Sequence, residues 1–197
     1  MAKVIKFPVP TPEKFGPERV RKKKQEQGRV PGQLNLFTQA KVIRLHQLSP
    51  FEEALMLDDQ GERNKARIGY LKSIEECDCA ADAYCNLGII ESQEGNTAKA
   101  IDCFTQCLRN DPRHYEAHYN LANLYAEVGN FSLAKVHYEI AIEIEPSFTN
   151  SYFNLGLTLA MIKQFKEAVK VLLEYRKLTP PENWKQANDL IEKLSSF

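Results

Sequence analysis

The sequence predicts an all-α solenoid, in which pairs of antiparallel helices repeat along the chain and stack side by side. Three series of residues that recur every 34 positions support this prediction. They are Gly61, Gly95 and Gly129; Ala66, Ala100, Ala134 and Ala168; and the large apolar residues Tyr70, Phe104, Tyr138 and Leu172. A unit of this length that holds two amphipathic helices cannot bury its apolar face alone, so neighbouring units must pack against each other.

Residues 1–46 are predicted to form a disordered, basic N-terminal arm. Five prolines interrupt any helical pattern there, and the run from Arg21 to Lys24 repels itself. The arm holds eleven Lys or Arg and three Glu, whereas the rest of the chain holds 15 basic and 23 acidic residues. The arm therefore has a surplus of eight positive charges and the remainder a surplus of eight negative charges, so the two parts should attract each other.

A short apolar segment interrupts the arm at Gln33, Leu34, Asn35, Leu36 and Phe37. It is similar to the motif with which bacterial proteins bind the replication sliding clamp, which is Gln-Leu, then Ser or Asp, then Leu-Phe. An extended segment of this kind could place Leu36 and Phe37 in an apolar pocket of such a partner. The alternative is that the apolar residues of the segment pack on the first repeat of this chain.

Helices are expected from Ser49 onward, because its hydroxyl can cap the first helix while Glu52 completes a Ser-x-x-Glu capping box. The pattern predicts helix pairs at 49–60 with 63–77, 81–94 with 97–110, 115–128 with 131–145, and 149–163 with 165–177. The glycines at 61, 95 and 129 allow the first helix of a pair to end in a left-handed conformation. Lys163 takes this place in the last unit, where a looser or differently closed turn is expected.

Small residues on facing helices should let the two backbones of a unit approach closely. These are Gly88, Ala122 and Gly156 on first helices and Ala100, Ala134 and Ala168 on second helices. The aromatic candidates for the core between units are Tyr84, Phe104, Tyr138 and Tyr152. Beyond the last unit, Thr179 and Glu182 predict another capping box, and apolar residues at helical spacing predict a helix within 181–197 that caps the stack.

Three units carry a pattern that resembles the tetratricopeptide repeat (TPR). The unit at 81–114 carries it through Tyr84, Leu87, Gly88, Gly95, Ala100, Phe104 and Pro112; the unit at 115–148 through His118, Leu121, Ala122, Tyr125, Gly129, Ala134, Tyr138, Ala141 and Pro146; and the unit at 149–180 through Tyr152, Leu155, Gly156, Phe165, Ala168 and Pro180. The unit at 47–80 departs from it, with Glu53 where the others have Leu, and is interpreted as a degenerate repeat.

The resemblance implies a right-handed superhelix whose concave face, lined by first helices, holds an extended peptide. Asn86, Asn120 and Asn154 recur at one repeat position and are expected to point into that groove. A side-chain amide both donates and accepts a hydrogen bond, so this asparagine series could pair with a peptide backbone of any sequence. A structural role for the three amides is the alternative.

Beside the asparagine series, the expected groove has an acidic and aromatic composition. Its residues are Asp82, Cys85, Ile89, Glu116, Tyr119, Asn123, Glu127, Phe153, Leu157 and Met161. Some relatives in the family bind a C-terminal carboxylate with paired lysines and an arginine, which are missing here. The composition favours a neutral or basic segment with apolar anchors. The basic arm is itself a candidate ligand.

Catalysis, cofactors and metals are not expected. The four histidines are scattered over the repeat pattern, and the sequence contains no Gly-rich phosphate loop and no set typical of nucleophilic catalysis. The five cysteines have no Cys-x-x-Cys spacing or accompanying His that would complete a zinc site. The start of the chain lacks the apolar stretch of a signal peptide, and reduced thiols are expected, so we predict a cytoplasmic protein.

The predicted function is that of a non-enzymatic scaffold or adaptor that binds a protein segment in its concave groove. The alternative is a nucleic-acid-associated protein, whose arm contacts phosphates through its basic run or docks on a sliding clamp. An anionic membrane surface is a further candidate for the basic run, and a solvated, unbound charge run is its simplest interpretation. The sequence predicts no oligomeric state.

Overall fold

The computed structural model describes residues 48–196, and the regular structure in this range is helical throughout, which confirms the all-α prediction. The predicted arm and the segment Gln33–Phe37 lie outside the described residues. The elements are α2 (Pro50–Asp59), α3 (Arg63–Glu75), α4 (Ala80–Gln93), α5 (Thr97–Asn110), α6 (Tyr115–Glu127), α7 (Phe131–Ile144), α8 (Thr149–Met161), α9 (Phe165–Leu178), the 3-10 turn η1 (Pro181–Asn183) and α10 (Lys185–Leu194).

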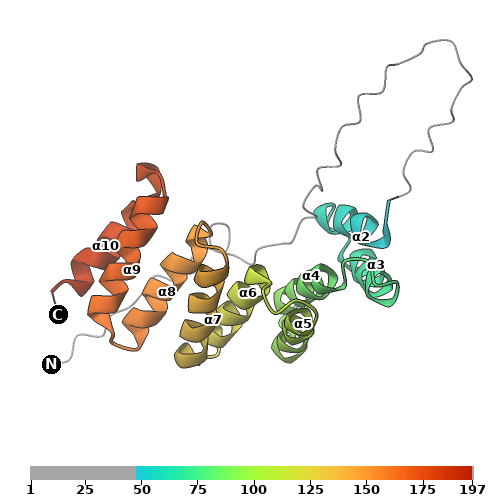
Figure 1. Ribbon diagram of the computed structural model, residues 1–197, viewed down its shortest axis with the longest axis horizontal. Helices are drawn as coiled ribbons and strands as arrows, with labels where there is room; N and C mark the ends of the chain where they lie inside the picture. Colours follow the sequence, from blue (N-terminus) through green and yellow to red (C-terminus); the bar gives the residue numbers. More distant parts are fainter. Residues whose placement is uncertain (1–47, 197) are drawn as a thin grey trace, which may run out of the picture.

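Consecutive helices form hairpins that follow one another along the long axis of the molecule (Figure 1). The pairs are α2 with α3, α4 with α5, α6 with α7, and α8 with α9, and α10 packs on α9 at the C-terminal end. Each observed boundary lies within two residues of its predicted position, because the 34-residue pattern marks both turns of every unit. The fold is the predicted solenoid.

The start of the stack is capped as the sequence predicts. Ser49 Oγ accepts a hydrogen bond from the backbone N–H of Glu52 (3.3 Å), and the Glu52 carboxylate accepts one from the Ser49 N–H (3.0 Å). The second predicted capping box is wrong, since the Thr179 hydroxyl instead donates to the Tyr175 carbonyl (2.7 Å). The chain then makes the turn η1, and α10 begins after Trp184 without a side-chain cap.

Small residues do bring the helices of a unit together. A Cβ at Gly88 of α4 would lie 2.8 Å from the Phe104 ring of α5, and one at Gly156 of α8 would lie 2.7 Å from the Leu172 side chain of α9. Both distances are shorter than van der Waals contact allows. The large residue of the second helix therefore fills the space that the absent side chain leaves.

Two of the four predicted core aromatics lie in the core. Phe104 and Tyr138 are 1% and 2% exposed. Tyr84 and Tyr152 are only partly buried, and the Tyr152 hydroxyl donates to the carbonyl of Pro146 (3.0 Å). Both pack against a core cluster while remaining partly exposed, which is typical of a side chain with an apolar ring and a polar hydroxyl.

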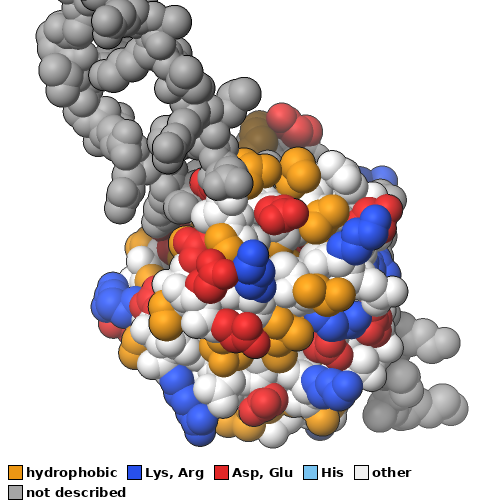
Figure 2. Space-filling view, turned by 90° about the vertical axis from the view of Figure 1, so that its right-hand side faces the viewer, with side chains coloured by type: hydrophobic (Ala, Val, Ile, Leu, Met, Phe, Trp, Pro, Cys, Tyr) orange, Lys and Arg blue, Asp and Glu red, His pale blue; other side chains and the backbone are white. Residues whose placement is uncertain are grey.

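The degenerate first unit is joined to the second by an ion-pair network as well as by apolar contact. Arg67 of α3 contacts Glu91 of α4 through Nε (3.0 Å) and Glu94, at the C-cap of α4, through Nη2 (2.6 Å). Figure 2 shows acidic, basic and hydrophobic side chains interspersed on the outer face at this end of the stack. Met56, Ile68 and Leu71 are exposed hydrophobic residues of this unit. Such a mixed surface is typical of a terminal unit.

The turn at Lys163 closes in the same way as the glycine turns, so the expected looser turn is wrong. Lys163 has a φ of 63°, beside 78° at Gly129. Its N–H donates to the Ala160 carbonyl (3.1 Å), as that of Gly129 donates to Ala126 (3.1 Å). The repeat geometry thus forces a side chain into the left-handed region, which costs about 1–2 kcal/mol.

Replacing this residue should stabilise the protein. We predict that Lys163→Gly raises the free energy of unfolding by about 0.5–1 kcal/mol, since relief of the left-handed strain exceeds the added chain entropy of glycine. The matched variant Gly129→Lys should lower it by a similar amount, because the space around Gly129 is open and only the φ angle matters there. Urea denaturation measures both changes, and equal stability of both variants with the natural protein would contradict this account.

Candidate functional site

The predicted groove residues lie on three first helices that are neighbours in the stack. Helix α6 contacts α4 on one side and α8 on the other. Asn86 lies on α4; Glu116, Tyr119, Asn120, Asn123 and Glu127 lie on α6; and Phe153 and Asn154 lie on α8. The structure therefore brings the eight residues onto one row of helices, which we call the first-helix surface (α4, α6 and α8).

The asparagine series is buried, whereas the sequence predicted amides open to a ligand. Asn86, Asn120 and Asn154 are 0%, 2% and 5% exposed. Asn120 Nδ2 contacts Cys85 Sγ of α4 at 3.8 Å, and Asn154 Nδ2 donates to Asn123 Oδ1 of α6 at 2.9 Å. These bonds tie the first helix of one unit to that of the unit before it, so the amides have a structural role.

The amide of Asn154 is satisfied on one side only. Its Nδ2 also donates to the Tyr119 hydroxyl (3.3 Å), while Asn123 Oδ1 accepts a further hydrogen bond from Tyr138 (2.5 Å). The carbonyl oxygen Oδ1 of Asn154 is buried and has no hydrogen-bond partner within residues 48–196. A buried acceptor left in this state costs about 1–3 kcal/mol, so a donor that reached it would gain free energy.

The two expected aromatic anchors belong to the core. Tyr119 is 0% exposed and packs edge-on against Phe148 with ring centroids 5.0 Å apart. Phe153 is 3% exposed and packs against Tyr175 of α9 at 5.4 Å. Position 5 of these two repeats thus contributes to the core, and the repeat pattern alone could not distinguish this role from a contact with a ligand.

The charged residues of the first-helix surface are acidic. Helices α4, α6 and α8 contain Asp82, Glu91, Glu116 and Glu127 and have no Lys or Arg in their sequences. Burial of part of the side chain raises the pKa of Glu127. Asn123, Asp82 and Glu116 are partly exposed, so they and Glu127 are the polar groups that a ligand can reach.

The sequence analysis missed a role for His114, which it treated as one of four scattered histidines. Its ring lies at the N-cap of α6, with Nδ1 3.1 Å from the Ala117 N–H and Nε2 3.1 Å from Asp82 Oδ1. The neutral ring caps the helix through Nδ1, whereas the protonated ring can donate from Nδ1 to Glu116 (3.3 Å). Burial lowers the pKa of His114, but the hydrogen bond to Asp82 and the negative charges around the ring outweigh it and raise this pKa to about 9.

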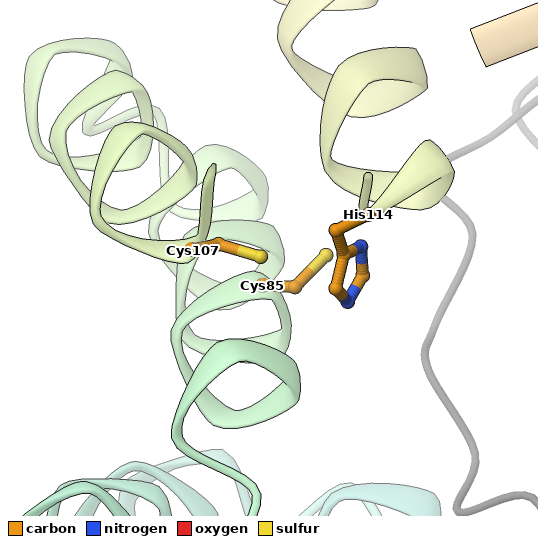
Figure 3. A group of neighbouring side chains, drawn as sticks. All are labelled: Cys85, Cys107 and His114. Atoms are coloured by element: carbon orange, nitrogen blue, oxygen red, sulfur yellow. The ribbon is translucent and has the colours of Figure 1, made fainter. Parts of the chain in front are cut away.

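The same ring lies beside two thiols, contrary to the prediction that no histidine accompanies the cysteines. The ligand atoms of Cys85, Cys107 and His114 all lie within 4.8 Å of one another (Figure 3). The spacings of 22 and seven residues match no short metal-binding motif, so only the packing of three helices reveals the group.

A second histidine pair joins α6 to α7. His118 Nδ1 and His137 Nδ1 are 2.9 Å apart, and His118 Nε2 lies 3.3 Å from the Pro112 carbonyl, to which it donates. With its proton on Nε2, His118 accepts at Nδ1 from His137, an arrangement that protonation of His118 would break. Burial lowers the pKa of both rings, and the charge of His118 adds to this effect at His137, whose pKa falls to about 4.

Comparison with known proteins supports the geometry. The tetratricopeptide repeat family matches residues 81–114 and 115–148. The chain therefore contains two tetratricopeptide repeats, in residues 81–148. Each helix of this TPR protein within residues 48–196 falls short of the length and apolar character that a membrane crossing needs.

Two relatives show how widely the repeats occur. The TPR protein is 28% identical over 102 residues to an Hsp70-Hsp90 organising protein of Plasmodium falciparum, covering 52% of this chain and 40% of the relative. It is 33% identical over 124 residues to human Protein O-mannosyl-transferase TMTC3, covering 57% of this chain and 13% of the relative. The chain thus spans less than half the length of these relatives, and the shared part is the repeats.

A solved structure shares the fold. The first TPR of Spaghetti (RPAP3) bound to the HSP90 peptide SRMEEVD superimposes with a TM-score of 0.55 and 24% sequence identity, covering 59% of this chain and 90% of that chain. At this identity the likeness establishes the fold of the repeats. The ligand of this chain has to be inferred from its own residues.

The histidine pair predicts a pH dependence of stability. Because the folded pKa of His137 is lowered to about 4 from an ordinary value of 6.5, the unfolded chain binds more protons between these pH values. The pair therefore contributes stability that is full above about pH 6.5 and is lost as the pH falls toward 4. We predict that in His137→Gln the midpoint of urea denaturation depends less on pH between about pH 4 and pH 6.5 than it does in the natural protein.

The comparison is with the natural protein under identical buffers, since carboxylates also titrate in this window and contribute equally to both chains. Parallel curves for the variant and the natural protein would show that the histidine pair is not coupled to folding.

Proposed function

We propose that this TPR protein is a non-enzymatic scaffold that binds an extended peptide segment along the first-helix surface. The observation that supports this most directly is the unpartnered acceptor Oδ1 of Asn154, between α6 and α8. A backbone N–H of a bound segment supplies the missing donor after a small displacement of the side chains that cover the oxygen. The partly exposed Asn123 and Glu116 lie on the same helix row and offer further polar contacts.

The charge of the surface sets the chemistry of the partner. Helices α4, α6 and α8 carry four acidic residues and no Lys or Arg, although Glu91 is buried and paired with Arg67 of α3, and Asp82 and Glu116 contact His114. A segment such as SRMEEVD, which the related structure holds, carries three acidic residues and would be repelled here. The partner we propose is therefore neutral or basic, in agreement with the sequence prediction.

The basic arm of residues 1–46 is a candidate ligand of the same surface. Its surplus of eight positive charges is matched by the surplus of eight negative charges in the remainder of the chain. A tethered segment has a high effective concentration when its length spans the distance to the site. The arm would then compete with an external basic segment for the first-helix surface. The cytoplasmic location of the protein stays a prediction.

Peptide binding can be tested with two fluorescent probes on the chain that lacks residues 1–46. The basic probe is a peptide of residues 17–31 of this chain, and the acidic probe is SRMEEVD. The basic probe should bind and the acidic probe should not, because only the first complements the acidic surface. Binding of the basic probe should weaken when the intact chain replaces the truncated one.

A charge substitution locates the binding surface. The double variant Glu116→Gln and Glu127→Gln should weaken the basic probe by about 3–10-fold, since each exposed charge contributes about 0.2–1 kcal/mol. The matched control is Glu139→Gln with Glu143→Gln, two exposed residues of α7, a second helix. The proposed groove would be refuted if the two double variants bound the basic probe equally well. It would also be refuted if SRMEEVD bound more tightly than the basic probe.

A second function rests on the segment Gln33–Phe37 and its resemblance to a clamp-binding motif. In this case the arm docks on a sliding clamp or contacts DNA phosphates, and the repeats recruit another protein. A peptide of residues 28–42 should then bind a bacterial clamp and lose affinity with Phe37→Ala. DNA binding by the intact chain should fall steeply with salt and disappear on deletion of residues 1–46.

A further inference from the structure

Three helices from two repeats converge on a buried group of metal-ligating side chains. Cys85 comes from α4, Cys107 from α5 and His114 from the N-cap of α6. Their exposed fractions are 0%, 0% and 4%, and their ligand atoms lie within 4.8 Å of one another. Figure 3 shows the Cys107 thiol pointing toward Cys85 and the Cys85 thiol pointing toward the imidazole of His114.

The separations suit a tetrahedral ion of the size of zinc. Zinc binds thiolate sulfur at about 2.3 Å and imidazole nitrogen at about 2.0–2.1 Å, so its ligand atoms lie about 3.5–3.8 Å apart. The observed group needs to contract by about 1 Å at most. Rotation of the two Cys side chains about χ1 provides such a movement without a change in the helix positions.

A carboxylate contacts the histidine of the group, although Asp82 lies outside the set whose ligand atoms are all within 4.8 Å of one another. Asp82 Oδ1 lies 3.1 Å from His114 Nε2, which is close to the separation of two ligands on one tetrahedral ion. The Asp82 side chain is 30% exposed. The other three members lie deeper in the stack.

We propose that Cys85, Cys107, His114 and Asp82 bind one Zn²⁺ ion, which would join the second repeat to the third. Two thiolates, one imidazole and one carboxylate form a closed set of four ligands, which is typical of structural zinc rather than of a catalytic site with an open position. Binding displaces the two thiol protons and adds the free energy of zinc binding to that of folding. The site shares Asp82 and Cys85 of α4 with the first-helix surface, but zinc binding is measured without a peptide, so failure of the peptide tests would not refute it.

The test uses the full chain, reduced, freed of metal with a chelator and carrying no histidine tag. Zinc is titrated against a chromophoric competitor, and Co²⁺ is used as a spectroscopic substitute that reports thiolate ligands by charge-transfer absorption. We expect one equivalent of zinc per chain, a thiolate-to-cobalt band, and a higher melting temperature with zinc than without it.

Matched cysteine variants assign the ligands. Cys107→Ser should weaken zinc binding by at least about 100-fold and remove the rise in melting temperature, whereas Cys103→Ser, four residues earlier on α5, should leave both unchanged. The pair Cys77→Ser with Cys79→Ser tests the other thiols, which are exposed or partly exposed in the α3–α4 turn, and should also leave binding unchanged. Asp82→Asn should weaken zinc binding without removing the thiolate-to-cobalt absorption band.

Two outcomes would overturn the proposal. One is the absence of stoichiometric zinc binding and of a thiolate-to-cobalt band in the folded natural protein, a result that does not depend on any variant folding. The other is zinc binding that survives Cys107→Ser and is lost with Cys77→Ser and Cys79→Ser.

Discussion

Each hairpin of this protein can bury its second apolar face only against the next hairpin, and this dependence governs the structure. Within a hairpin, Gly88 and Gly156 let the helices approach until Phe104 and Leu172 fill the space left by the missing side chains. Between hairpins, Tyr119 packs against Phe148 at the start of the next unit. The first helices are thereby held in one row, which the proposed peptide binding requires.

The row holds the stack together and, in the proposed function, also binds the peptide, so the asparagine series would serve both. Asn154 uses its amide nitrogen to bind Asn123 and Tyr119 of the preceding unit, which leaves its oxygen as the group with unused capacity. A ligand would therefore contact polar groups whose positions are already fixed by the packing of the repeats. Such preorganised groups lose little conformational entropy when a segment binds.

The 34-residue interval was enough to predict the features of the fold that depend on the local spacing of residues. The helix boundaries and the Ser49 capping box follow from the spacing of Gly, Ala and large apolar residues, and the structure confirms them. Burial of the asparagines could not be predicted, because one repeat position can face either a neighbour or a ligand. The left-handed Lys163 was missed since the stack overrides its local preference. The group of Cys85, Cys107 and His114 was missed because three helices must pack before it exists.

Hydrogen exchange after removal of the last units tests the dependence between neighbours most directly. A chain that ends at residue 147 lacks α8, on which α7 packs, and it also lacks α9 and α10. The account predicts that backbone amides of α6 and α7 then exchange at least about 10-fold faster, while those of α2 and α3 change little. Unchanged protection of α6 and α7 would show that each hairpin is stable alone and would contradict the central claim.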